Sequence, residues 1–332
     1  NGMVVVDEAR FRSLSAELAS ARVYLAQTRG DVPGTLEHAR RALGLTPEGD
    51  HAARATGTAL VALALWAHGD LEAAHRTFSD ALARMRMGGH VLSAIRGTFV
   101  LGDLRTAQGR LHEAARTYER GLQLAQGQSH PATPETDELY LGLSEVHREW
   151  GDLETATRRM LEVSESAERA AYAGNRQRWC IAMARIREAH GDLGGALALL
   201  DEAERLHVRD PLPRVRPAAA MKARLWTRQG RLSEATGWVR ERGLTVHDDL
   251  SYVREYEHIT LARVLIARSA ADGDERTRHE AVRLLERLLR EAKVAVLNDE
   301  TTYERWNSVS DQLPQLSTIV LVEGADKVQA GS

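Results

Sequence analysis

The chain has 332 residues, of which 43% are hydrophobic and only 5% aromatic, and its 44 basic and 47 acidic residues leave a formal charge of -3. An apolar fraction made mainly of Ala and Leu favours closely packed helices over a β-sandwich. Because the charges nearly balance, no overall field attracts nucleic acid or an anionic membrane. We therefore expect an all-α protein that binds no nucleic acid through this segment.

The cysteine content and the apolar runs bear on location. The single cysteine, Cys180, has no partner for an intrachain disulfide, and no cationic, apolar signal sequence opens the chain. The longest apolar run, residues 59–67, is far shorter than the roughly 20 residues that cross a bilayer. We expect a cytoplasmic protein without a membrane partner.

In chain order, the dominant pattern is a recurring Gly-Asp/Arg-Leu-x-x-Ala motif. Successive glycines are 40, 42, 40 and 39 residues apart, a regularity that indicates a repeat protein. Two degraded copies flank the clear ones, with Gly34, Leu36 and Ala39 before them and Gly273 and Ala281 after them. The five clear copies are Gly69-Asp70-Leu71 with Ala74, Gly109-Arg110-Leu111 with Ala114, Gly151-Asp152-Leu153 with Ala156, Gly191-Asp192-Leu193 with Ala196, and Gly230-Arg231-Leu232 with Ala235.

The motif has the chemistry of a tight helix-helix turn. Glycine ends the first helix in the left-handed conformation, and Asp caps the second helix. Leu and the small Ala share one face of the second helix and let the two helices approach closely. Apolar columns also occur nine residues after and five residues before each glycine, so each repeat supplies two helices of about 15 residues.

These features resemble the tetratricopeptide (TPR) repeat. The resemblance implies a right-handed superhelix of about seven helix-turn-helix repeats over residues 7–292, with a concave groove lined mainly by the first helix of each pair. Prolines fall between the helix pairs, and the longest connections are near 128–135 and 208–217. We expect plain spacers there, the alternative being ordered loops over the groove rim.

Residues 293–332 depart from the repeat. Residues 293–297 and 317–322 have the β-branched character of buried strands, and a polar, helical stretch at 300–312 lies between them. Through Val294-Ala295-Val296, Asp311-Gln312-Leu313-Pro314 and Ile319-Val320-Leu321 this tail resembles a piece of the amino-terminal lobe of acyl-CoA ligases, over about 35 residues and without their phosphate-binding loop. A disordered or irregular carboxy-terminal cap is the interpretation that we prefer to a strand-helix-strand unit.

A second resemblance concerns residues 240–265 and, through the 40-residue repeat, the residues from about 20 to 292. Arg240-Glu241-Arg242-Gly243-Leu244, the run from Asp248 to Glu257 and the run from Thr260 to Leu265 are similar to the MalT-like class of LuxR-type bacterial transcriptional regulators. In this class the helical array detects an inducer or an inhibitory protein, an ATPase precedes it and a DNA-binding helix-turn-helix follows it. Gly-Lys-Ser/Thr is absent here, and no basic helix-turn-helix is found. The resemblance therefore implies an isolated sensor region.

The sequence contains no recognisable motif for catalysis or metal binding. Thirteen histidines show no His-Glu-x-x-His and no clustered ligand spacing. Gly142-Leu143-Ser144-Glu145-Val146 begins like a nucleophile elbow but has Val where the final Gly is required. We expect Cys180 to be a buried structural thiol. The sequence thus predicts no enzyme, no cofactor and no metal.

Six polar or aromatic residues on predicted first helices are the candidates for the groove. Arginine and aromatic side chains suit stacking on rings, sugars or peptide side chains and the binding of anions. Trp179 has an alternative structural role, because the residue 40 positions earlier is Leu139, a core residue. The candidates are Arg96, Tyr140, Arg178, Trp179, Tyr252 and Tyr256.

Two functional hypotheses compete. In the first, the chain is the sensor domain of a MalT-like regulator, and a small-molecule effector or a protein partner in the groove changes the orientation or self-association of other modules. In the second, the chain is a stand-alone TPR adaptor that holds a peptide or helix of a partner. An enzyme that uses the tail is a distant third.

Overall fold

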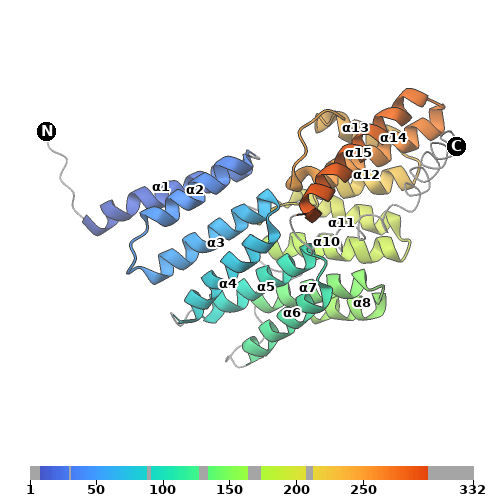
Figure 1. Ribbon diagram of the computed structural model, residues 1–332. Coiled ribbons are helices and arrows are strands. Elements are labelled where there is room, and N and C mark those ends of the chain that lie inside the picture. Colours follow the sequence, from blue (N-terminus) through green and yellow to red (C-terminus); the bar gives the residue numbers. More distant parts are fainter. Residues whose placement is uncertain are drawn as a thin grey trace, which may run out of the picture.

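The computed structural model describes residues 8–29, 31–87, 91–126, 134–163, 173–206 and 212–297. These residues form fourteen α-helices and one 3-10 helix, and none of them lies in a β-strand. The helices follow one another as seven pairs stacked into a curved array (Figure 1). The prediction of an all-α protein with about seven helix-turn-helix repeats is confirmed.

Each pair has a first and a second helix. The first helices are α1 (Glu8–Thr28), α3 (His51–His68), α5 (Val91–Ala107), α7 (Pro134–Glu149), α10 (Ala173–Ala189), α12 (Ala218–Arg228) and α14 (Glu255–Asp272), the last preceded by the 3-10 helix η1 (Tyr252–Arg254). The second helices are α2 (Val32–Leu45), α4 (Leu71–Met87), α6 (Leu111–Gln126), α8 (Leu153–Glu162), α11 (Leu193–Arg205), α13 (Leu232–Glu241) and α15 (Glu275–Leu297). Within the described ranges, no helix has both the length and the apolar character of a bilayer span.

The repeat glycines form the predicted turns. All five clear copies have a positive φ, between 74° and 95°, and Gly273 has a φ of 69°. Where the motif carries Asp, its carboxylate caps the second helix: Asp152 accepts from the Thr155 amide at 3.0 Å, and Asp192 accepts from the Gly195 amide at 2.8 Å. Local sequence therefore specifies each turn.

The alanine of the motif lies at the contact between the helices of each pair. All five of these alanines are fully buried, with 0% exposure. The apolar column five residues before each glycine is buried as well, with 0% to 2% exposure. A larger side chain in place of the alanine would separate the helices, because interiors are close-packed. The alanines are Ala74, Ala114, Ala156, Ala196 and Ala235.

The core is distributed along the array instead of being gathered in one place. Four apolar clusters follow one another, and each joins consecutive helix pairs. The largest extends from α1 to α7 and contains Phe78, Phe99 and Tyr118. Such nearest-neighbour packing is characteristic of repeat proteins.

The turn between the two helices of the first repeat lies earlier than predicted. Gly34 is inside α2, and its amide donates to Asp31 Oδ1 at 2.9 Å. Asp31 caps α2 in the same way that Asp70, 39 residues later, caps α4. The motif glycine of the first repeat is therefore at position 30 and not at Gly34, so the predicted position of the motif was wrong by four residues. Thr35 occupies the place of the motif alanine and is buried.

The strand predicted at residues 293–297 is also wrong. These residues continue α15, which runs without a break to Leu297. The division predicted between residues 292 and 293 thus falls inside a helix. The apolar face of α15 packs into the core through Ala281, Leu284 and Leu288. Because extending a formed helix adds one hydrogen bond per residue, the helix continues through residues 293–297. The helix and strand predicted at 300–312 and 317–322 lie outside the described residues.

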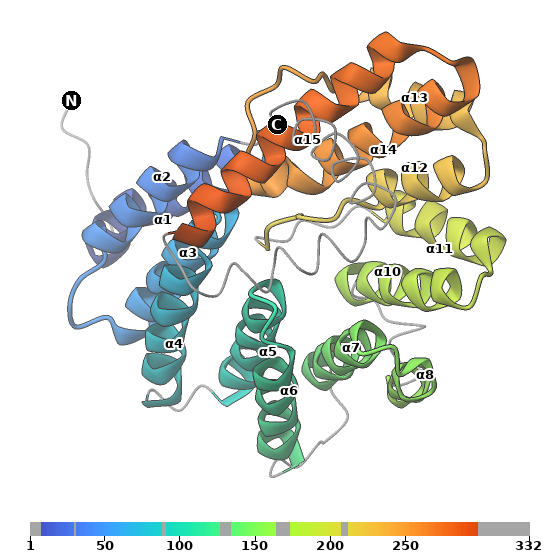
Figure 2. The ribbon, with the colours of Figure 1, turned by 45° about the vertical axis from the view of Figure 1, so that its right-hand side comes forward.

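The array curls so far that η1, at the start of the seventh pair, contacts α3 of the second pair (Figure 2). Trp66 Nε1 of α3 donates to the hydroxyl of Tyr252 in η1 at 3.3 Å, across 186 residues of sequence. Leu212, in the connection between α11 and α12, packs against the core cluster of the amino-terminal half. The spacer interpretation is therefore wrong for Leu212, and Arg216 of the same connection pairs with Glu149 of α7 at 3.6 Å.

Candidate binding surface on the inner face

The first helices of successive pairs line the inner side of the curve (Figure 2). Side-chain contacts between them identify the residues that face inward. Arg178 of α10 bonds to Asp103 of α5, a contact that passes over the intervening α7 pair. Such contacts are expected where the helices converge on the concave side of a superhelix. We call this surface the inner face.

One column of the repeat places a charge on the inner face. It lies six residues before the repeat glycine and contains Asp103, Glu145, Arg185 and Arg224, with Leu63 in the first clear copy. Arg263 continues the column on α14, since the steps from Arg185 to Arg224 and from Arg224 to Arg263 are both 39 residues. The column changes from acidic on α5 and α7 to basic on α10, α12 and α14.

The acidic part holds a partly buried network around Asp103. The hydroxyl of Tyr118 donates to Asp103 Oδ1 at 2.6 Å, and Arg178 Nη2 donates to Oδ2 at 2.9 Å. The Arg178 guanidinium also lies 4.0 Å from the centre of the Phe99 ring. Burial, reinforced by the Asp103 charge, raises the pKa of Tyr118 well above its usual range. Tyr118 therefore stays protonated and donates to the carboxylate.

The change of sign occurs between α7 and α10. Arg185 pairs with Glu145 and, through Nη2, with Glu149 Oε1 at 2.9 Å. Glu149 is shared with Arg148 and, at 3.6 Å, with Arg216 from the connection before α12. Burial, and then the neighbouring Arg216, lowers the pKa of Arg185 to about 9, so it remains charged at neutral pH. Three guanidinium groups thus share two carboxylates here.

The basic part is arranged around Arg224. Its guanidinium lies over the Tyr256 ring, 3.6 Å from the ring centre, and its Nε donates to Thr260 Oγ1 at 2.9 Å. Burial lowers the pKa of Arg224 to about 10, and the charges of Arg263 and Arg216 act in the same direction. Arg224 also remains charged at neutral pH.

The structure divides the six predicted residues into three groups. Arg178 and Tyr256 belong to the inner-face network. Tyr140 and Trp179 pack against the apolar cluster of α7, α8 and α10, as expected if Trp179 takes the place of a core residue. The remaining two lie apart from both: Arg96 is an exposed residue of α5, and Tyr252, expected on a first helix, is in η1 and bonds to Trp66.

Sequence reasoning missed Arg185, Arg216 and Arg224. A signal for two of them was present, because the column six residues before the glycine is charged in four of the five clear copies. This column adjoins the apolar one that was recognised, so a charge there lies at the edge of the core. Arg216 had no such signal, since it is outside the repeat.

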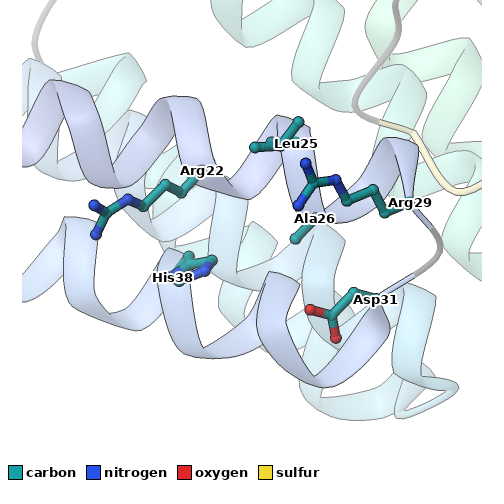
Figure 3. A pocket seen from close by; sticks show the side chains of 6 residues that line it. All are labelled: Arg22, Leu25, Ala26, Arg29, Asp31 and His38. Carbon is teal, nitrogen blue, oxygen red and sulfur yellow. The ribbon is translucent and has the colours of Figure 1, made fainter.

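A pocket of about 240 Å³ lies elsewhere, between α1 and α2 (Figure 3). Arg22, Arg29, Asp31 and His38 are among the residues that line it, and His38 Nδ1 is buried without a hydrogen-bond partner in the described structure. The pocket is smaller than the roughly 300 to 1,000 Å³ of typical ligand sites, and both arginines are exposed. We therefore place the candidate site on the inner face.

The motifs with catalytic resemblance have structural roles. Gly142 lies against the Tyr118 ring, and Ser144 is buried and donates to the Ala156 carbonyl at 2.8 Å. Cys180 is buried, as predicted, and burial raises the pKa of its thiol to about 11. Across the described ranges, no three His, Cys, Asp or Glu side chains are grouped to hold a metal ion.

Comparison with known proteins places the fold. A solved Rap protein complexed with competence and sporulation factor is 10% identical, with a TM-score of 0.55, covering 96% of this chain and 99% of that one. The Rap conjugation gene regulator of the plasmid pLS20, in complex with the Phr* peptide, is 11% identical, with a TM-score of 0.53, covering 95% and 97%. At these identities the likeness concerns the fold alone.

Among curated proteins no match is found. The family described as the MalT-like TPR region matches residues 16–309, which is most of the 332 residues and includes every helix from α2 to α15. The match confirms the resemblance predicted from the repeat over residues 20–292. The chain belongs to the MalT-like TPR region family.

Proposed function

We propose that this chain is the sensor region of a cytoplasmic bacterial transcriptional regulator, and that an effector or a partner protein binds to its inner face. Family membership over residues 16–309 is the observation that carries the proposal. The inner face supports it, because arginine and tyrosine side chains from several first helices meet there. The role is recognition and not catalysis.

A peptide is one of the two ligand classes under this proposal. One solved Rap protein is complexed with competence and sporulation factor and the other with the Phr* peptide, and both share the fold of this chain. A small-molecule effector is the other class. Either ligand signals only if it binds one arrangement of the array more tightly than another, and so shifts the orientation or self-association of neighbouring modules.

A stand-alone TPR adaptor is the alternative function. The Rap structure in complex with the Phr* peptide favours it as well, because an adaptor holds a peptide or a helix in the same kind of array. The two functions differ in gene context: ATPase and DNA-binding modules encoded in the same reading frame support the sensor, and their absence supports the adaptor.

The thermal midpoint of the 332-residue chain, screened against oligosaccharides, nucleotides, metabolites and peptides, tests the proposal. A ligand at 100 times its dissociation constant adds about 2.7 kcal/mol to the free energy of unfolding, enough to move the midpoint by degrees. A reproducible shift with one class of small molecule supports the sensor. A shift with peptides alone, together with a gene that lacks the other modules, replaces the sensor by the adaptor.

A further inference from the structure

The charges of the inner face do not cancel along its length. Asp103 and Glu145 at the acidic end of the column are paired with Arg178 and Arg185. At the basic end, Arg224 has no carboxylate partner anywhere in the described residues. Burying a guanidinium away from water is costly unless a counter-charge accompanies it. Arg224 therefore lacks a balancing anion among the described residues.

Nearby acidic residues are already engaged. Glu188 of α10 is the acidic group whose charge reaches Arg224, and it pairs with Arg228 at 2.7 Å. Glu149 is shared among Arg148, Arg185 and Arg216. Arg216 and Arg263 add positive charge around Arg224.

The guanidinium of Arg224 is held in a defined orientation. Its face lies on the Tyr256 ring, and its Nε donates to Thr260 Oγ1. Its two terminal nitrogens have no hydrogen bond to the described part of the chain, and they are not buried. Stacking and one anchoring hydrogen bond leave these nitrogens directed as a pair, which is the geometry that binds the two oxygens of a carboxylate or phosphate.

We propose that Arg224, stacked on Tyr256 and flanked by Arg185 and Arg216, is an anion site that binds a carboxylate or phosphate group of the inner-face ligand. The inference rests on the proposed function in taking the inner face as the ligand-binding surface, and it adds the chemical class of the ligand. The site supplies charge-assisted hydrogen bonds from Arg224, and the ring of Tyr256 limits the positions that the guanidinium adopts.

Titration of the full chain with inorganic phosphate and with citrate, against chloride at the same ionic strength, tests the site. The wild-type thermal midpoint should rise saturably with one or both anions, and the anion that acts identifies phosphate or carboxylate as the preferred group. Arg224→Gln should weaken this binding about ten- to hundredfold. Arg224→Lys keeps the charge but not the paired donors, so its affinity for the anion should lie between those of the wild type and Arg224→Gln.

Arg231→Gln is the matched control. It removes the same charge from an exposed arginine that pairs with Glu234 at 2.7 Å, and it should respond to the anions as the wild type does. Without anion, Arg224→Gln should unfold at or above the wild-type midpoint, because it removes a partly buried charge that has no counter-charge among the described residues.

Two results overturn the anion site. The first is a wild-type midpoint that does not respond to either anion, and the second is an equal response in Arg224→Gln. These results leave the proposed function intact. An uncharged ligand that binds wild type and Arg224→Gln equally well would support the sensor and exclude only the anion site.

Discussion

Gly142→Ala should destabilise the array although alanine is the better helix former. Gly142 of α7 and Gly102 of α5 both lie against the Tyr118 ring, which comes from α6. A Cβ at Gly142 would be 2.4 Å from ring atoms Cε1 and Cζ, and one at Gly102 would be 2.2 Å from Cε1. The ring is 1% exposed, and its hydroxyl is fixed to Asp103, so it has no room to yield.

The magnitude follows from two opposing effects. Overpacking a tight core costs about 1 to 3 kcal/mol, and a contact about 1 Å closer than van der Waals distance belongs at the upper end. Replacing Gly by Ala inside a helix gains up to about 1 kcal/mol. The net expected loss is about 2 kcal/mol. Gly237→Ala in α13, where a Cβ meets nothing within 4 Å, should instead gain about 0.5 to 1 kcal/mol.

Urea unfolding followed by circular dichroism at 222 nm measures both variants. Tyr118→Leu should cost less in the Gly142→Ala background than in the wild type, because the smaller side chain relieves the clash. If Gly142→Ala unfolds at or above the wild-type midpoint, as Gly237→Ala should, the proposed confinement of the Tyr118 ring is incorrect.

Three further predictions concern pH, reactivity and shape. Burial, and then the charge of Arg105, lowers the pKa of His75 from 6.5 to about 4. Because the unfolded chain binds that proton first, the free energy of unfolding should fall by about 2 kcal/mol as the pH drops from 6.5 to 4, after allowance for partial exposure. His75→Asn should reduce this pH dependence in urea titrations, and an unchanged pH dependence contradicts the assignment. Cys180, with its pKa raised to about 11 by burial, should react with a thiol reagent at pH 8 about a hundred times more slowly in the folded chain than in urea, and equal rates would show that it is accessible. Tyr252→Ala removes the hydrogen bond to Trp66, so the radius of gyration from small-angle X-ray scattering should increase at constant helix content; an unchanged radius shows that other contacts keep the array closed.

The turns of the repeat were predictable because their causes are local. A glycine with positive φ, an Asp three residues before the amide that it caps, and an Ala at the helix contact all lie within six residues of one another. The same short range explains the error at Gly34, where a second nearby glycine imitated the motif while Asp31 was the true cap. At residues 293–297, β-branched composition indicated a strand, but the established helix α15 continued through it.

The inner face was only partly predictable. Arg178 and Tyr256 were selected as aromatic or cationic residues on first helices, and both belong to the network. Their partners were not predicted, because Arg178 and Asp103 are 75 residues apart and come together only when the array curls. The charged column was visible in the sequence. Its change of sign explains the ion pairs only when adjacent first helices are seen side by side.

The sequence by itself determined the helix pairs, their turns, their number and the buried columns, since each depends on residues close together in the chain. The tertiary structure decided which charges are paired. Curvature brings Glu145 against Arg185 and Trp66 against Tyr252, and it leaves Arg224 beside Tyr256 with no carboxylate partner in the part of the chain that the structure describes. Electrostatic balance depends on distances between segments about 40 to 190 residues apart, and stacking sets those distances.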